Sequence, residues 1–190
     1  MADTNRVLFG FSQVHVGTYE IDPLTKAVSL GTPYHQEGAV GFSPENQGES
    51  VDFFADNYDY FSDETVGPRS GDLVVAKFDR DFLTSFCGHR NTAGGGIGEV
   101  INPVRPRIYM AFQVEGDAHG MRVIMYNGIV GVVNREFATL EGSRTPATEA
   151  LPLKFIGDQA SGLIVDRYYP GDAGYDTLFT NPPLPALASE

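Results

Sequence analysis

Two short runs of alternating apolar and polar residues, Ala39–Glu45 and Ser50–Ala55, lie between Gly38 and Phe61. Alternation with a period of two is typical of β-strands, because successive side chains point to opposite faces of a sheet. The residues Glu45–Gly48 between the runs favour a turn, so we predict a hairpin that is hinged there. One face of this hairpin would be apolar and the other small or acidic. Such a segment restricts the chain to a fold built on sheets.

Similar alternation recurs along the rest of the chain. Before residue 31 we predict two short strands, one around Val14–Tyr19 and one at Val28–Leu30. Further on, the pattern predicts a strand at Gly71–Phe78 and two more hairpins, Arg107–Glu115 with Met121–Val133 and Leu151–Ile156 with Leu163–Tyr169. Two segments lack the alternation and are predicted as loops, the polar Ser62–Ser70 and the glycine-rich Arg90–Arg107.

A single short helix is predicted after Asp79. The Asp79 carboxylate is suited to the N-cap position, and Phe82, Leu83 and Phe86 fall on one helical face. Gly88 supplies the C-terminal stop. The chain's one cysteine, Cys87, follows this apolar face, so we expect a buried and unreactive thiol with no disulfide.

Composition agrees with a turn-rich, mainly β protein. The 190 residues include 22 Gly, 12 Pro and 22 aromatic residues, 13 Phe and 9 Tyr. Length indicates one domain, residues 1–190, with extended loops and a C-terminal arm from about residue 170. Met1–Glu20 has no signal-peptide pattern, and no apolar run approaches the length of a membrane span. We therefore expect a soluble chain with no membrane partner.

The charge balance is strongly acidic. Asp and Glu number 25 against 13 Lys and Arg, a formal net charge of −12. Proteins that hold nucleic acid through its phosphates need clustered Lys and Arg, so this balance argues against that mode of binding. It argues equally against attachment to an anionic membrane surface.

Motifs that would carry chemistry are incomplete. The Gly94–Gly98 run lacks the following helix of a phosphate-binding loop, and the four histidines lack the spacing of a zinc site. The acidic turn Asp56–Asp59 lacks the twelve-residue calcium-loop pattern. We predict no catalytic, cofactor-binding or metal site, and hence a protein that is not an enzyme.

In order and spacing, several motifs between about residues 38 and 170 resemble the major tail tube proteins of long-tailed, siphovirus-type bacteriophages. The motifs are Phe53 through Asp56-Asn57 to Tyr60, Gly71-Asp72-Leu73, Asp81-Phe82-Leu83 with Gly88, Phe112–Asp117, Arg122-Val123 with Tyr126-Asn127, and Thr145–Leu151. The resemblance does not extend to the Gly94–Gly96 loop or to the tail.

That resemblance implies a fold and a role. The fold would be a β-sandwich or open barrel with one short flanking helix, whose long hairpins form a shared barrel in a ring. Six subunits would make each ring, and rings would stack helically into a hollow tail tube that conducts DNA and houses the tape measure protein. The further partners would be other tail proteins at the tube ends. The protein would belong to the virion, after assembly in the host cytoplasm.

A tube needs a channel wall and contacts between subunits. A wall that passes duplex DNA suits short or acidic side chains, so we assign to the lumen Ser43, Glu45, Ser50, Asp52, Asp56, Gln113 and Glu115. To contacts between subunits we assign the loop glycines and three arginines that would pair with acids of a neighbour: Gly94, Gly95, Gly96, Arg69, Arg105 and Arg107.

Two other classes of function stay open at this point. One is a carbohydrate-binding β-sandwich module of a phage tail tip, with stacking platforms supplied by Tyr58, Tyr60, Tyr168 or Tyr169. The other is a hydrolase on a β scaffold that has no recognisable motif. A binding module would stay monomeric and bind a glycan, whereas a tube protein would assemble.

Overall fold

The computed structural model describes residues 10–55, 57–115, 120–135 and 147–187. The first half of the chain forms β1 (Phe11–Ile21), β2 (Val28–Leu30), β3 (Tyr34–His35), β4 (Ala39–Phe42), β5 (Glu45–Asn46), β6 (Ser50–Ala55), β7 (Tyr58–Glu64), β8 (Arg69–Val75) and helix α1 (Arg80–Ser85). The second half forms β9 (Arg90–Asn91), β10 (Ile97–Gly98), β11 (Ile108–Val114), β12 (Arg122–Val130), β13 (Asn134–Arg135), β14 (Glu149–Phe155) and β15 (Val165–Tyr168).

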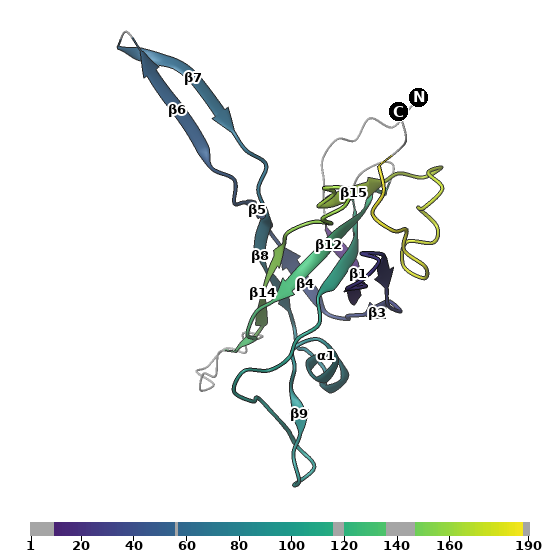
Figure 1. The fold of residues 1–190 in the computed structure, drawn as a ribbon. Helices are drawn as coiled ribbons and strands as arrows, with labels where there is room; N and C mark the ends of the chain where they lie inside the picture. The colour runs from purple at the N-terminus through teal and green to yellow at the C-terminus, as the bar shows by residue number, and fades with distance from the viewer. Residues whose placement is uncertain (1–9, 56, 116–119, 136–146, 188–190) are drawn as a thin grey trace.

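One large antiparallel sheet makes up the body of the molecule (Figure 1). Its strands run in the order β2-β1-β11-β12-β14-β8-β4, and β3, β5, β13 and β15 extend it at the sides. The sheet curls until β4 lies near β1, but the described strands form no ladder between these two. The fold is therefore mainly β, an open rather than closed arrangement with one short helix, and this prediction is confirmed.

The main core fills the inside of the curled sheet. Alternation along the strands directs apolar side chains into this core. In β14, for example, Leu151, Leu153 and Phe155 point inward while Lys154 points to solvent. Helix α1 closes one end with Phe82, Leu83 and Phe86. It begins as predicted at Asp79, whose carboxylate accepts a 2.8 Å hydrogen bond from the Phe82 amide.

A second core covers the outer face of β1, β11 and β12. It contains Tyr19, Tyr109, Ala111, Ile124 and Tyr126 from the strands and Leu178 from the C-terminal segment. The Phe179 ring stacks on His15 at 4.6 Å, and the Arg122 guanidinium lies 4.1 Å from the centre of the Tyr175 ring. We expected an extended arm after residue 170. Instead, this segment packs on the sheet through its apolar residues.

Two predicted hairpins pair differently in the structure. β4 and β6 are strands, as predicted, but β4 pairs with β8 and β6 pairs with β7. The chain does not reverse at Glu45–Gly48; it reverses between Ala55 and Tyr58, where Asn57 has a left-handed φ of 66°. Likewise β14 pairs with β8 and β12, and β15 pairs with β12, so these two strands do not form a hairpin.

Other predictions hold with shifted boundaries. The two strands predicted before residue 31 are present as β1 and β2, which pair antiparallel, and the predicted β11–β12 hairpin is confirmed. The predicted loop Ser62–Ser70 is shorter, because β7 continues to Glu64 and β8 begins at Arg69. Within the predicted loop Arg90–Arg107, β9 and β10 pair as a small hairpin whose tip carries the three glycines. Among the described residues there is no helix with the length and apolar character needed to cross a membrane.

Packing of the C-terminal segment can be tested by truncating one side chain. Leu178 is fully buried in the second core, so we expect Leu178→Ala to lower the free energy of unfolding by about 2–5 kcal/mol. Leu187→Ala is the matched control, since Leu187 is 66% exposed and its truncation should change stability by less than about 0.5 kcal/mol. Chemical denaturation measures both. Equal stability of the two variants would contradict a structural role for the segment.

Candidate assembly surface

The strands β6 and β7 form a two-stranded ribbon, Ser50–Glu64, that projects from the body (Figure 1). Among the described strands, these two pair only with each other. An isolated two-stranded ribbon is marginally stable in water, because it has no second layer on which to bury a face. The ribbon is thus the part of the described chain that most lacks a packing partner.

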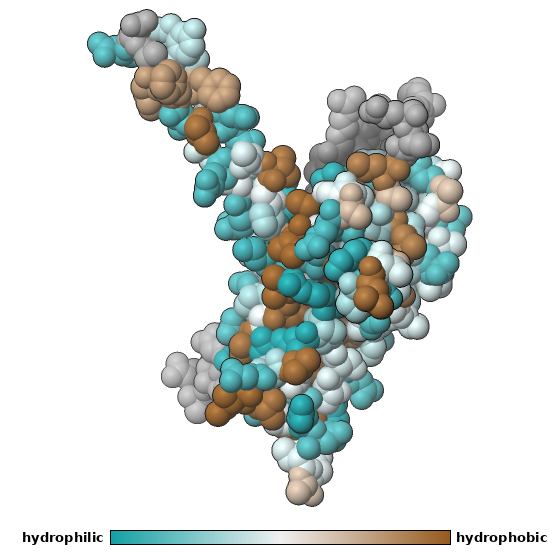
Figure 2. All heavy atoms as spheres, in the orientation of Figure 1, coloured by the Kyte–Doolittle hydropathy of each residue, from teal (hydrophilic) through white to brown (hydrophobic). Residues whose placement is uncertain are grey.

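Large apolar side chains cover the outer part of the ribbon (Figure 2). Six of them are between 54% and 68% exposed: Val51, Phe53, Phe54, Tyr58, Tyr60 and Phe61. Phe53 and Phe61 are direct cross-strand partners, and the rings of Tyr58 and Tyr60 lie 6.1 Å apart. Phe53 and Phe54 are consecutive in β6 and therefore point to opposite faces of the ribbon, so both faces expose large side chains of the kind that mark an interaction site.

The ribbon is also acidic. Between residues 27 and 68 the sequence has no Lys or Arg, while eight acids occur: Glu37, Glu45, Glu49, Asp52, Asp56, Asp59, Asp63 and Glu64. On the ribbon, the Ser62 hydroxyl donates a 2.6 Å hydrogen bond to Asp52, its cross-strand partner. A partner for this surface must therefore offer apolar contacts together with positive charge.

Asn46 fixes the root of the ribbon. Its amide nitrogen donates to the Glu64 carboxylate and to the Thr65 carbonyl, both at 3.1 Å. Its side-chain oxygen accepts hydrogen bonds from the amides of Gly67, at 2.9 Å, and Gly48, at 3.3 Å. One side chain thus connects the outgoing chain to the returning chain.

Two glycines allow these chains to come close. A Cβ atom on Gly48 would lie 1.7 Å from the Thr65 carbonyl oxygen, and one on Gly67 would lie 2.6 Å from the Gly48 amide nitrogen. The sequence prediction placed a turn at Asn46 and Gly48 and missed this role. The signal that could have revealed it is the second glycine, Gly67, in the predicted loop.

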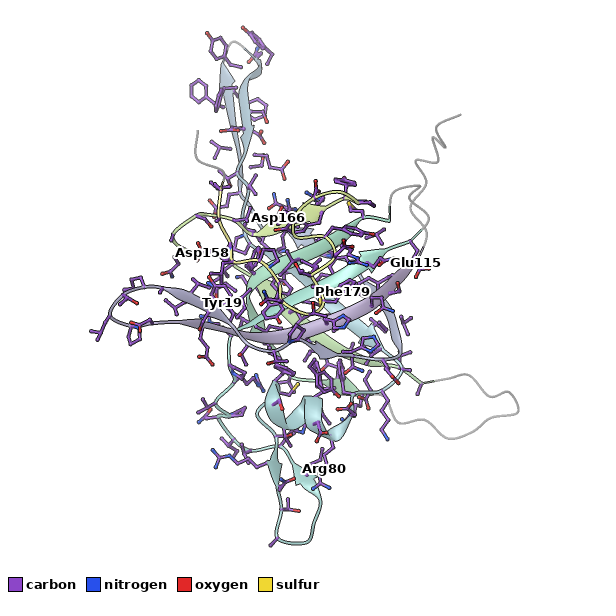
Figure 3. The ribbon with its side chains drawn as sticks, turned by 90° about the vertical axis from the view of Figure 1, so that its right-hand side faces the viewer. Tyr19, Arg80, Glu115, Asp158, Asp166 and Phe179 are labelled. Carbon is purple, nitrogen blue, oxygen red and sulfur yellow. The ribbon has the colours of Figure 1, made fainter. Side chains whose placement is uncertain are left out.

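The residues assigned to the lumen fall into separate places. Ser43 and Glu45 are exposed beside β8 near the root, whereas Ser50 and Asp52 lie on the ribbon. Gln113 and Glu115 lie at the end of β11, and Glu115 is well separated from the ribbon (Figure 3). The Arg122 guanidinium donates a hydrogen bond to the Gln113 side-chain oxygen at 3.3 Å, and the Ser12 hydroxyl donates one to the Glu115 carboxylate at 2.5 Å. Asp56 lies outside the described residues. The chain therefore brings only part of this set together.

Residues assigned to contacts between subunits are similarly divided. Arg69 lies at the start of β8, and Gly94–Gly96 form the tip of the β9–β10 hairpin, where the Arg80 guanidinium donates to the Gly95 and Gly96 carbonyls. Arg107 is exposed. The Arg105 guanidinium instead donates to the carbonyls of Cys87, at 3.1 Å, and Val130, at 3.2 Å. Arg105 is therefore engaged within its own chain.

A second unpartnered feature is the outer edge of β4. This strand ends the sheet, and a shallow groove of about 550 Å³ follows it, lined by residues that include Phe42, Ser43, Glu45 and Asp72. A Cβ atom on Gly41 would meet no atom within 4 Å. β1 approaches this edge without forming a ladder, so within the described residues the edge leaves backbone amides and carbonyls of β4 without a strand partner.

Groups that would support other functions are dispersed. Tyr58 and Tyr60 lie on the ribbon, while Tyr168 is part of β15 and donates to Asp166 at 2.6 Å, so the four tyrosines form no common platform. Within the described residues no three His, Cys, Asp or Glu side chains group together as metal ligands do. Burial raises the pKa of Cys87 to about 12, as expected for an unreactive thiol.

Comparison with known proteins gives only remote structural likenesses. No family model and no curated protein matches the chain. The chain is similar to one in the anti-feeding prophage cap, the AFP tube terminating cap, at 8% identity and a TM-score of 0.49, over 89% of this chain and 99% of that one. It is also similar to a chain of the PVC sheath–tube complex, an extracellular contractile injection system in its extended state, at 8% identity and a TM-score of 0.46, over 83% and 88%. Because both scores are below 0.5, we base the function on this chain's own residues.

Substitution at the root tests how the ribbon is held. Gly48→Ala must separate the two chains, because the new methyl group has no room beside Thr65. We expect amide hydrogen exchange at residues 46–67 to accelerate by roughly tenfold or more, with little change in the core strands. The control is Gly41→Ala, where the methyl group enters open space. Unchanged exchange in the Gly48→Ala protein would show that the root is not closely packed.

Proposed function

We propose that this chain is a structural subunit of a bacteriophage tail tube. Six copies form a ring, and rings stack with a helical rotation into a hollow tube that conducts DNA. The observation that carries this proposal is the projecting ribbon with six exposed apolar side chains. The motif resemblance described above points to the same role.

The ribbon supports an assembly role on energetic grounds. Burial of one Phe, Val or similar side chain contributes about 1.5–3 kcal/mol, so six exposed side chains represent a large unused driving force. On a free monomer such a surface promotes non-specific aggregation. Contact with a neighbouring subunit removes it from water, and the assembled tube then stabilises the ribbon in return.

The open sheet supports the proposal of a closed ring. β4 and β2 end the main strand order, and their outer edges carry no further strand among the described residues. A head-to-tail contact whose rotations sum to a full turn joins such edges around a ring and leaves none exposed. The shared barrel of the ring is part of this proposal.

Acidic charge suits a channel for DNA. Six copies carry 6 × −12 = −72 formal charges per ring. Acidic walls repel phosphates, whereas basic walls would retain DNA through many phosphate contacts. Ser43 and Glu45, both exposed beside β8, remain predicted wall residues. The tape measure protein would occupy the channel before DNA passes, and other tail proteins would bind the tube ends in the virion.

Self-assembly is the direct test. Purified protein, alone or with other tail proteins, should give rings or tubes in electron microscopy and fast-sedimenting species in the ultracentrifuge. A protein with Phe54→Ser and Tyr60→Ser should assemble poorly with an unchanged unfolding midpoint, because both side chains are exposed. A monomer at every concentration that binds a glycan saturably would instead favour the carbohydrate-binding module.

Wall assignment is tested by reversing one charge. Tubes of Glu45→Lys protein should bind short duplex DNA at low salt and release it as salt rises, while wild-type tubes bind none. Glu20→Lys is the control, since Glu20 is exposed on β1, far from the root in sequence. Gel mobility and sedimentation measure binding. Equal DNA binding by the two variants would contradict a lumen position for Glu45.

A further inference from the structure

The molecule has two distinct ends. The ribbon projects from one end, and α1 with the β9–β10 hairpin lies at the other (Figure 1). The view turned by 90° agrees, with the ribbon at the top and Arg80 at the bottom (Figure 3). Pro103, Val104 and Arg105 lie against Gly88 just after α1, so this part of the chain between β10 and β11 belongs to the end opposite the ribbon.

This opposite end has its own exposed apolar group, which we call the loop patch. It consists of Val100, Ile101, Val104 and Val132. Ile101 is 94% exposed and Val104 is 85% exposed, values that are unusual for such residues without a partner. Hydrophobic atoms are also prominent at the lower end of the molecule in the space-filling view (Figure 2).

A cavity of about 230 Å³ lies beside the loop patch. Val100 and Val132 line it together with Cys87, Gly88 and Pro103, and His89, Glu99, Asn102 and Arg105 complete its wall. An apolar cavity of roughly 150 Å³ is enough to hold benzene. The cavity therefore has room for one aromatic ring, and its polar wall suits a tyrosine hydroxyl.

Charge near the loop patch is opposite to that of the ribbon. Residues 86–107 contain Arg90, Arg105 and Arg107 against one acid, Glu99, which lies 3.5 Å from His89. Within the part of the chain that the structure describes, Arg90 and Arg107 have no carboxylate at ion-pair distance. Residues 45–64 contain seven acids and no base. Both ends thus expose apolar side chains, and their charges are opposite in sign.

We propose that the ribbon of one copy docks on the loop patch of a second copy, with an aromatic ring from the ribbon in the neighbouring cavity. This inference rests on the proposed function and specifies its ring-to-ring contact. The contact is head-to-tail, because each copy uses its ribbon on one side and its loop patch on the other. A head-to-tail contact whose rotation does not close a ring repeats along an axis, as a stack of rings requires.

A symmetric contact between two ribbons is disfavoured. It would place seven acids of one ribbon region against seven of another, with no Lys or Arg from residue 27 to 68 to neutralise them. Docking on the loop patch places the same acids toward the end of the molecule that carries the exposed Arg90. Electrostatics therefore selects the head-to-tail partner over the symmetric one.

Complementary variants test the contact. The ribbon variant carries Phe54→Ser and Tyr60→Ser, the patch variant carries Ile101→Ser and Val104→Ser, and the control carries Leu24→Ser, at a residue 91% exposed in the β1–β2 turn. Each of the first two should raise the concentration needed for assembly on the order of tenfold or more, and the control should not. Mixed together, the two variants should form a discrete complex by sedimentation, because one supplies an intact ribbon and the other an intact patch.

Cross-linking gives an independent readout that does not depend on the cost of the serine substitutions. Cys87 is buried, so one introduced cysteine can be labelled selectively. A mixture of Tyr58→Cys and Ile101→Cys proteins should cross-link with a short bis-maleimide, and a mixture of Tyr58→Cys and Leu24→Cys should not.

The outcomes separate the inference from the proposed function. If the patch variant forms tubes as wild type does, or if the mixture gives neither complex nor cross-link, the ribbon docks elsewhere and only this inference is overturned. If wild-type protein never assembles, the proposed function fails and the contact fails with it. A complex that requires an intact loop patch, and that does not form from the ribbon variant alone, supports both the proposed function and this contact.

Discussion

The β11–β12 hairpin is buried on both faces, and the rest of the body is organised around that constraint. Ile108, Met110 and Phe112 of β11 face the inner core, while Tyr109 and Ala111 between them face the outer one. A strand with two apolar faces needs a cover on each side. The curled sheet and α1 supply the inner cover. The outer cover comes from the segment that carries Leu178, so the last part of the chain is structural.

The same constraint explains a close approach in β1. Gly17 pairs with Tyr109, and a Cβ atom on Gly17 would lie 2.4 Å from the Tyr109 hydroxyl oxygen. The absence of a side chain lets the tyrosine ring lie across β1 and donate to the Gly31 carbonyl at 2.8 Å. A large aromatic ring on the outer face is thus accommodated without a gap in the sheet. Both faces of this part of the sheet are covered by its own chain, in contrast to the faces of the ribbon.

Local patterns in the sequence identified strands well and pairing poorly. Alternation located β11 and β12, and the short connection between them made their pairing a local matter. β4 alternates just as clearly, yet its partner β8 lies about thirty residues away, and period-two alternation carries no information about a distant partner. The turn was misplaced because Asn46 and Gly48 are residue types that favour turns, whereas here the Asn46 side chain and the Gly48 backbone join two chains. The outer cover was missed because residues 170–187 bury single side chains from irregular turns, which leave no periodic signal.

Rigidity at the root determines whether the ribbon can act as an assembly element. A ribbon that swung freely would lose conformational entropy on docking, and that loss would offset part of the gain from apolar burial. Asn46 joins the outgoing chain to Glu64, Thr65 and Gly67, and the backbones at Gly48 and Thr65 are in close contact, which restrains movement of the ribbon about its root. The backbone hydrogen bond from Gln47 to the Pro68 carbonyl, at 2.9 Å, continues this link into β8. The direction of the ribbon is therefore set by the sheet before any partner binds, so much of the entropic cost of docking falls on folding rather than on assembly.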